Sequence, residues 1–225
     1  REQGLSVLRS NAARNPTLAE PQLRLAEVYA AGNDVESARS SFRLALQNAP
    51  DALPVVSNWI KLELSGNRIR EAKALAIEYQ KSRPFDAAGY LLEADILIRQ
   101  KNFGEAATRV QRALGLKPET ETAVQLHGLL MAVGNQAAAK DFEERWLLGR
   151  PKDGVFLFHL AWAALGKKDL AGAEVFYRRV LDFDPKNPAA LNNVASIMVQ
   201  LGKSGALEVA QLANTLAPNQ PAFMD

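Results

Sequence analysis

Residues 173–185 read AEVFYRRVLDFDP and hold the pattern that decides the fold. Ala173 is followed by apolar side chains four and seven residues later, at Tyr177 and Val180, and by Pro185 twelve residues later. Positions with this spacing lie on one face of an α-helix, so the segment predicts a helix with a single packed face. Proline lacks the backbone N–H and clashes with the preceding turn, so Pro185 is expected to end that helix.

The same pattern recurs along the chain at a nearly constant interval. Seven of the eleven prolines are separated by steps of 34, 34, 34, 33, 34 and 33 residues, namely Pro16, Pro50, Pro84, Pro118, Pro151, Pro185 and Pro218. The residue twelve positions before each of the last six is alanine in every case: Ala38, Ala72, Ala106, Ala139, Ala173 and Ala206. A constant small residue on a helix face indicates a close approach of another helix. The chain is therefore predicted to repeat one helical unit.

Each repeat has a second helical pattern upstream of this one, as at Leu160, Ala161 and Ala164. Between the two patterns stand turn sequences such as Gly32-Asn33-Asp34 and Gly166-Lys167-Lys168-Asp169. Glycine or asparagine in such turns can adopt the positive φ that ends a helix. Each repeat is therefore predicted to be a pair of helices joined by a tight turn.

A 34-residue unit of this kind resembles the tetratricopeptide repeat, with leucine, a small residue and tyrosine in the first helix, alanine, an aromatic residue and alanine in the second, and a final proline. The resemblance covers residues 16–218. It implies an all-α fold, a right-handed superhelix (α-solenoid) of helix-turn-helix hairpins. Residues 1–15 are expected to be the second helix of a truncated preceding repeat, and residues 16–225 one domain. The repeats within it are expected at about 19–52, 53–86, 87–120, 121–153, 154–187 and 188–219, followed by the start of a further unit. Because both ends stop within a repeat, the chain is expected to be part of a longer array.

The composition argues against several classes of function. The 27 basic and 25 acidic residues are mixed along the chain, so there is no basic stripe for binding nucleic acid. The absence of cysteine excludes disulfides and thiolate metal sites. No run of about 18 apolar residues, the length that a membrane span requires, is present. The only histidines, His127 and His159, fit no metalloprotease or catalytic-triad arrangement, and we interpret them as hydrogen-bonded residues of the helix packing. No catalytic residue, metal or cofactor is therefore expected.

The resemblance also implies where a partner would bind, since the first helices of such hairpins line a concave wall on which side chains one turn apart project together. In the first two repeats the candidates for this wall are mostly polar: Glu20, Leu23, Glu27, Ser57 and Lys61. In the later repeats the candidate partner-binding residues are Leu91, Asp95, Ile98, Gln125, Leu129, Phe158, Trp162, Leu165, Asn192 and Ser196. The row thus becomes apolar and aromatic toward the fourth and fifth repeats.

The segment VFLFHLAWAAL, residues 155–165, is apolar nearly all the way round. One face of such a helix packs in the core, and Phe158 and Trp162 are left to be covered by something else. Two interpretations stay open: the pair anchors a partner, or neighbouring repeats or self-association bury it. Trp59 and Trp146, in contrast, fall at positions that are expected to pack between helices.

The function that these patterns predict is a scaffold that holds a protein or peptide in its concave groove and carries out no reaction. Self-association through open repeat ends is a further possibility. Three segments, FDAAGYLLEADIL (85–97), AALNNVASI (189–197) and ALEVAQLANTLAPNQPAF (206–223), resemble the repeat proteins of bacterial PEP-CTERM systems. That resemblance implies exopolysaccharide production or surface-protein sorting, in the periplasm or at the outer-membrane periphery. A cytoplasmic adaptor or co-chaperone, and the recruitment segment of a larger enzyme, are the alternatives.

Overall fold

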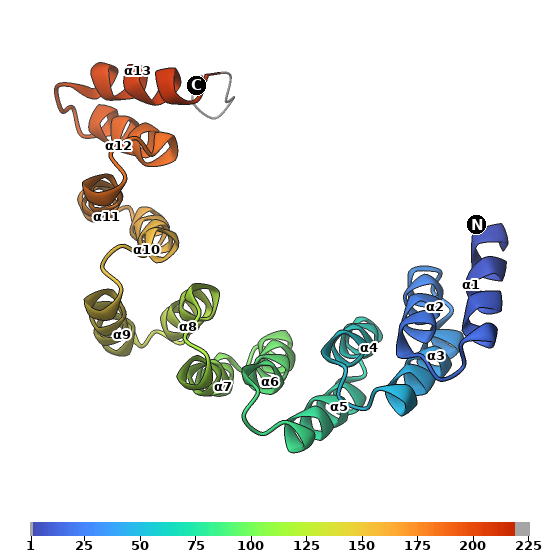
Figure 1. Ribbon diagram of the computed structural model, residues 1–225. Helices are drawn as coiled ribbons and strands as arrows, with labels where there is room; N and C mark the ends of the chain where they lie inside the picture. Colours follow the sequence, from blue (N-terminus) through green and yellow to red (C-terminus); the bar gives the residue numbers. More distant parts are fainter. Residues whose placement is uncertain (1, 219–225) are drawn as a thin grey trace. The chain divides into compact units, whose positions relative to one another are not determined.

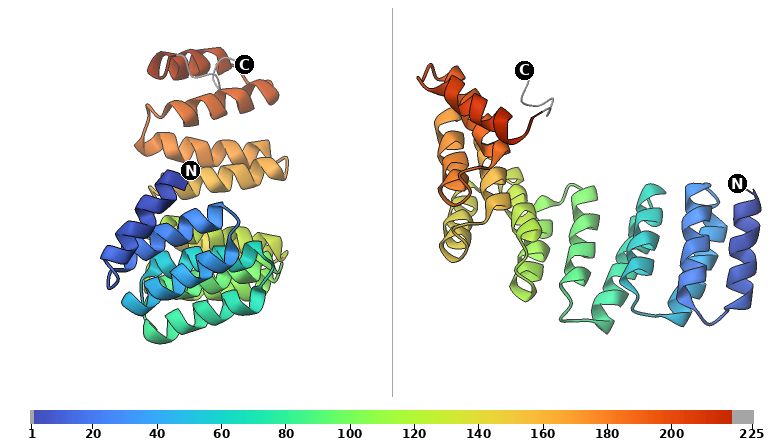
Figure 2. Two further views of the ribbon diagram at one scale, coloured as in Figure 1. Left: turned by 90° about the vertical axis from the view of Figure 1, so that its right-hand side faces the viewer. Right: turned by 45° about the horizontal axis from the view of Figure 1, so that its top comes forward.

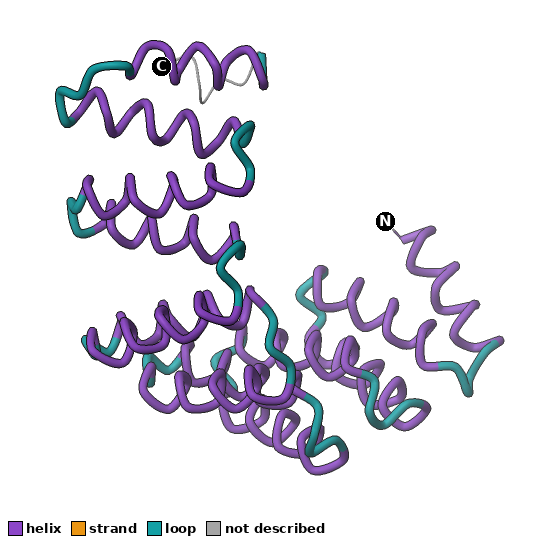
Figure 3. Tube along the Cα trace, turned by 60° about the vertical axis from the view of Figure 1, so that its left-hand side comes forward, coloured by secondary structure: helices purple, strands orange, loops and turns teal. Residues whose placement is uncertain are grey.

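The computed structural model describes residues 2–218, and within that range it contains thirteen α-helices and no β-strand (Figures 1 and 3). The all-α prediction is therefore confirmed. The helices are α1 (Glu2–Arg14), α2 (Ala19–Ala31), α3 (Val35–Asn48), α4 (Leu53–Ser65), α5 (Ile69–Ser82), α6 (Ala87–Arg99), α7 (Phe103–Leu116), α8 (Thr120–Ala132), α9 (Gln136–Gly149), α10 (Gly154–Gly166), α11 (Leu170–Phe183), α12 (Pro188–Gln200) and α13 (Ala206–Leu216).

The chain groups into two compact units. Unit 1 takes in Arg1–Pro118 and Leu129–Gly134, and unit 2 takes in Glu119–Gly128 and Asn135–Asp225. Within each unit the helices pack as hairpins, α2 with α3, α4 with α5 and α6 with α7 in unit 1, and α10 with α11 and α12 with α13 in unit 2. The second helix of a hairpin also packs against the first helix of the next, as α3 does on α4 and α11 on α12. In the right-hand view of Figure 2 the helices of unit 1 stand side by side in chain order.

Besides Gly205 in the last hairpin, with φ 85°, the turn inside each hairpin has one residue with positive φ, two residues after the first helix ends. These residues are Asn33, Asn67, Lys101, Gly134, Lys168 and Gly202, with φ between 56° and 75°. The prediction that asparagine or glycine takes this conformation is confirmed in four of the six turns. Lysine takes it in the other two, although L-residues with a long side chain adopt this region less readily. In the fifth hairpin it is Lys168, with φ 61°, that does so.

The second helix of most hairpins begins at a side-chain cap. Asp34, Asn135 and Asp169 each accept a hydrogen bond from the backbone N–H three residues later, at 3.2, 3.1 and 2.8 Å. Such caps satisfy one of the N–H groups that a helix leaves without a partner at its start. They fix where the second helix begins and hence which of its faces meets the first.

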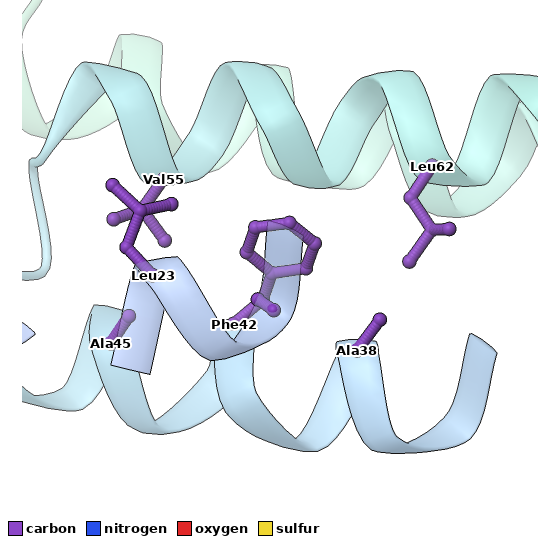
Figure 4. Close-up of a cluster of buried hydrophobic side chains, with 7 residues drawn as sticks. Leu23, Ala38, Phe42, Ala45, Val55 and Leu62 are labelled. Atoms are coloured by element: carbon purple, nitrogen blue, oxygen red, sulfur yellow. The ribbon is translucent and has the colours of Figure 1, made fainter. Parts of the chain in front are cut away.

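The core of unit 1 shows why the recurring alanine matters (Figure 4). Ala38 is fully buried on α3, one turn before Phe42, and both lie under Leu62 and Val55 of α4. The Phe42 ring also stacks on Trp59, with 6.0 Å between centroids. Of the six recurring alanines, five are buried and only Ala206, at the start of α13, is half-exposed. The small side chain lets two helices approach closely, and this close packing fixes the geometry of the hairpin.

A buried carboxylate ties three successive helices of unit 1 together. Glu63 of α4 accepts hydrogen bonds from Arg39 of α3, at 2.8 and 2.6 Å, and from Arg68, which precedes α5, at 2.7 Å. The indole of Trp59 donates a further bond to it at 2.8 Å. Burial opposes ionisation, but these donors outweigh it and lower the pKa of Glu63 to about 2. The carboxylate is therefore charged and fully paired at neutral pH.

Candidate functional site

Unit 2 contains an open, mostly apolar groove of about 580 Å³. Its centre is α10, which contributes Val155, Phe158 and Trp162. The remaining walls come from α8, from the end of α11 and from the linker that follows α11: Val124, Val180, Phe183, Asp184 and Asn187, together with Gly154 and His159 of α10.

Helix α10 can contribute to both the core and the groove because it is apolar on two faces. One face is buried in the core through Phe156, Leu157 and Leu160. The other face leaves Trp162 66% exposed and Val155 largely exposed, an unusual position for large apolar side chains. No residue of α10 carries a charged side chain. The second apolar face is therefore available to a partner.

Phe158 and Trp162 have different positions in the groove. Phe158 is half-buried, and its ring meets that of buried Tyr177 edge to face, with 5.3 Å between centroids. It therefore forms a rigid wall that the core supports. Trp162 lies one turn further along α10 and is the exposed member of the pair. The prediction that both side chains lie on one surface agrees with the groove that they line together.

The two histidines form a hydrogen-bonded pair at the wall of the groove, whereas the sequence predicted only that each would be hydrogen-bonded within the helix packing. His127 Nδ1 and His159 Nε2 are 2.8 Å apart, and the rings meet at right angles. Burial lowers the pKa of His127 to about 4, and the neighbouring His159 and Lys167 add to that effect. Burial also lowers the pKa of His159, which lines the groove. Both rings are therefore neutral at pH 7, where one donates its N–H to the other.

The lining of the groove and two of the helices of unit 2 carry few charges. Helix α12, like α10, has no charged side chain, and the part of α8 that belongs to unit 2 has only Glu121. Asp184 is the one charged residue in the groove lining, and its Oδ2 accepts a hydrogen bond from Asn187 Nδ2 at 2.9 Å. At neutral pH the groove is thus apolar with a single negative charge at one end.

Unit 1 has a more polar hollow of about 330 Å³, which agrees with the gradient predicted from the sequence. It is lined in part by Glu27, Asn58 and Lys61, and Asn58 Nδ2 donates to Glu27 Oε1 at 2.9 Å. Four of its seven lining residues are polar or charged, so this hollow offers less apolar surface than the groove of unit 2.

The other predicted site residues lie outside the lining of the groove. Leu165 and Asn192 are half-buried and Ser196 is exposed in unit 2, while Leu91 and Ile98 are half-buried and Asp95 is exposed in unit 1. Gln125 is half-buried on α8. Leu129 is 6% exposed, so it belongs to the packed interior and has little surface for a partner.

The positions of Gln125 and Leu129 have a simple cause in the length of one linker. Four residues connect α5 to α6 and α9 to α10, but only three, Lys117 to Glu119, connect α7 to α8. Helix α8 therefore starts at Thr120, one residue earlier than an even count from Pro84 and Pro118 predicts. With that correction the equivalent of Phe158 is Val124, which does line the groove.

The sequence reasoning missed the part of the groove that first helices do not supply. Phe183 ends α11, and Asp184 and Asn187 belong to the linker after it. Val155 could have been found, because it lies on the same apolar helix, one turn before Phe158. The linker residues carry no periodic pattern, so only the packing reveals them.

Nothing in residues 2–218 resembles a metal centre or a membrane span. That part of the chain has no group of three or more histidine, aspartate or glutamate side chains able to hold a metal ion. None of its helices is long and apolar enough to cross a membrane.

Comparison with known proteins identifies the repeat. A tetratricopeptide-repeat model matches residues 58–119 and 134–188, and a second such model matches residues 22–52. No curated protein matches the sequence.

Several solved structures share the fold at low sequence identity. PilF of Pseudomonas aeruginosa is 17% identical, with a TM-score of 0.56 over 94% of this chain and 97% of that one. PilW, a type IV pilus biogenesis factor, is 16% identical, with a TM-score of 0.56 over 92% and 96%. Yeast Tom70 is 15% identical, with a TM-score of 0.65 over 94% of this chain and 46% of that one. At such identities the likeness extends to the fold alone.

Proposed function

Because the chain belongs to the tetratricopeptide repeat family, we propose that it works as a scaffold that binds a protein segment in the groove of unit 2. Stacked helical hairpins of this family serve protein–protein interaction. The proposal assigns that role to one surface, centred on Trp162 and Phe158. The scaffold carries out no reaction of its own.

The observation that carries the proposal is the exposure of Trp162 within an apolar groove. Exposed aromatic side chains surrounded by apolar walls are favoured anchor points for partners. Covering the exposed two-thirds of an indole removes on the order of 100 to 150 Å² from water, which is worth about 3 kcal/mol. That contribution is large enough to make the groove the centre of an interface.

The experiment compares three single variants in one assay of partner capture and one of thermal melting. Trp162→Ala and Phe158→Ala remove groove residues, whereas Leu148→Ala removes a side chain of the same unit that is 85% exposed outside the groove. We expect Trp162→Ala to abolish capture of the partner from the native host at an unchanged melting temperature. Leu148→Ala should change neither. Capture that survives Trp162→Ala, or a large drop in its melting temperature, would refute the assignment.

The finer proposal is that the captured partner belongs to an exopolysaccharide or PEP-CTERM surface-sorting system, and that the protein acts in the periplasm or at the outer-membrane periphery. Its support is the resemblance of the segments at 85–97, 189–197 and 206–223 to repeat proteins of those systems. Fractionation of the native host, together with the yield of exopolysaccharide after deletion of the gene, tests it. A protein found in the cytoplasm, or an unchanged yield and normal sorting, would count against it.

A further inference from the structure

The groove of unit 2 has an electrostatic character that restricts what can bind there. Its lining contains one carboxylate, Asp184, and no lysine or arginine. The paired histidines at its wall stay neutral at pH 7 because burial lowers the pKa of both, and their nitrogens share a hydrogen bond. A negatively charged ligand would therefore find no cation in the lining to pair with.

The helices around the groove differ in charge, since α11 carries Glu174, Arg178, Arg179 and Asp182 while two others carry no charge. Neither α10 nor α12 contributes a charged side chain, and Glu121 is the one charged residue of α8 within unit 2. Lys186, in the same linker as Asp184, is exposed but does not line the groove. Within the lining itself Asp184 is the one charged residue, so a cationic group can pair with it while an anionic group has no such partner.

Two features of the lining suit a basic side chain beside an apolar one. Asp184 has its Oδ2 bonded to Asn187, but a carboxylate has further acceptor positions that can receive an ammonium or guanidinium N–H. The exposed face of Trp162 can pack against the stem of lysine or arginine and attract its charge. Val155 and Phe158 leave room for a leucine or phenylalanine side chain of the same segment.

We propose that the groove selects a peptide segment in which aliphatic or aromatic residues are adjacent to lysine or arginine, and that Asp184 forms an ion pair with the basic residue. This inference rests on the proposed function and names the chemistry of its partner. Apolar contacts supply most of the affinity, and the charge supplies selectivity. Since Asp184 is exposed to solvent, its pair with the ligand is expected to change affinity about two- to fivefold.

A random twelve-residue peptide library, displayed on phage and selected on the whole chain, tests the proposal without knowledge of the natural partner. Binders that fail to bind Trp162→Ala define the groove-dependent set. We expect that set to be rich in lysine and arginine beside leucine or phenylalanine, and poor in aspartate and glutamate. Each binder is then synthesised with its basic residues kept, or replaced by glutamine.

The contribution of the peptide's charge to binding is measured as the ratio of two affinities, that of the peptide with its basic residues and that of the peptide with glutamine in their place. On the unaltered chain we expect a ratio of about two to five in 50 mM salt, falling toward one in 0.5 M salt. Asp184→Asn keeps an oxygen for Asn187 and should bring the ratio to about one. Asp182→Asn, two residues away and outside the lining, should leave it unchanged.

The possible failures are distinct. If every selected peptide binds the Trp162→Ala variant as tightly as the unaltered chain, the proposed function and this inference are both wrong. If groove-dependent binders exist but show no excess of basic residues, or keep their charge preference on Asp184→Asn, the groove still binds peptides and only the present inference is overturned.

Discussion

A drop in pH from 7 to 5 is expected to destabilise unit 2 through the pair formed by His127 and His159. His127 is only 4% exposed, and its pKa is lowered to about 4 from the usual value near 6.5. With a depressed pKa in the folded state, the unfolded chain takes up the proton first. The stabilisation is therefore complete above pH 6.5 and is lost as the pH falls toward 4.

The magnitude follows from the two pKa values of His127. Integrating its proton uptake in the folded and unfolded chains from pH 7 to pH 5 gives a loss of about 2 kcal/mol. His159, whose pKa burial also lowers, acts in the same direction. The donors around Glu63 and Glu174 lower the pKa of each carboxyl, so their stabilisation is lost only below about pH 4.5. Burial raises the pKa of Glu143, which opposes the histidine effect.

Urea unfolding followed by circular dichroism at pH 7, 6 and 5 measures this loss. The double variant His127→Gln/His159→Gln removes both titrating rings and leaves Glu143 in place, so the difference between it and the unaltered chain isolates the pair. We expect the unaltered chain to lose about 2 kcal/mol more than the variant between pH 7 and pH 5. Equal losses in the two proteins would refute the reasoning.

Two further comparisons, each measured by urea unfolding at pH 7, test the polar contacts that join helices. Glu63→Ala is expected to lower the free energy of unfolding by about 3 kcal/mol because Arg39, Arg68 and Trp59 lose their buried acceptor. Glu36→Ala removes an 83% exposed carboxylate that also pairs with Arg39 and should lower it by under about 0.5 kcal/mol. Similar losses in the two variants would contradict the importance of burial. Asp153→Ala is expected to cost about 2 kcal/mol, since Asp153 accepts bonds from the Phe156 N–H and from the Thr120 and Trp146 side chains. Asp169→Ala removes a cap that accepts one such backbone bond, and it should lower the free energy of unfolding by about 1 kcal/mol. An equal loss in the Asp153 and Asp169 variants would show that the bonds from Thr120 and Trp146 to Asp153 contribute nothing.

The hairpins could be predicted from the sequence because each depends on local features that recur. The interval between Pro151 and Pro185 spans one pair of helices, and Ala173 marks where the two approach. Each hairpin buries its face mainly against its neighbours, so a short sequence window holds most of the information. Phe158 and Trp162 could be found for the same reason, since a helix that is apolar on two faces can cover only one of them in the core.

The rest of the groove could not be predicted because it depends on a linker length and on packing between helices. The interval from Pro118 to Pro151 is 33 residues, one fewer than the intervals before it, but the proline spacing does not tell where in the repeat the missing residue falls. That one residue exchanges Gln125 for Val124 in the lining, because successive positions on a helix point in different directions. Asp184 was missed because nothing in a linker's sequence indicates which neighbouring helix it approaches.

The central claim, that the apolar groove of unit 2 is where a partner binds, is tested most directly by photo-crosslinking from within it. A photoreactive phenylalanine analogue is placed at Val155, which lines the groove and leaves Trp162 in place, in one protein and at Leu148, exposed outside the groove, in another. Irradiation in the native host should yield a discrete protein adduct from position 155 and none from position 148. Adducts that form equally at both positions, or only at 148, would contradict the claim.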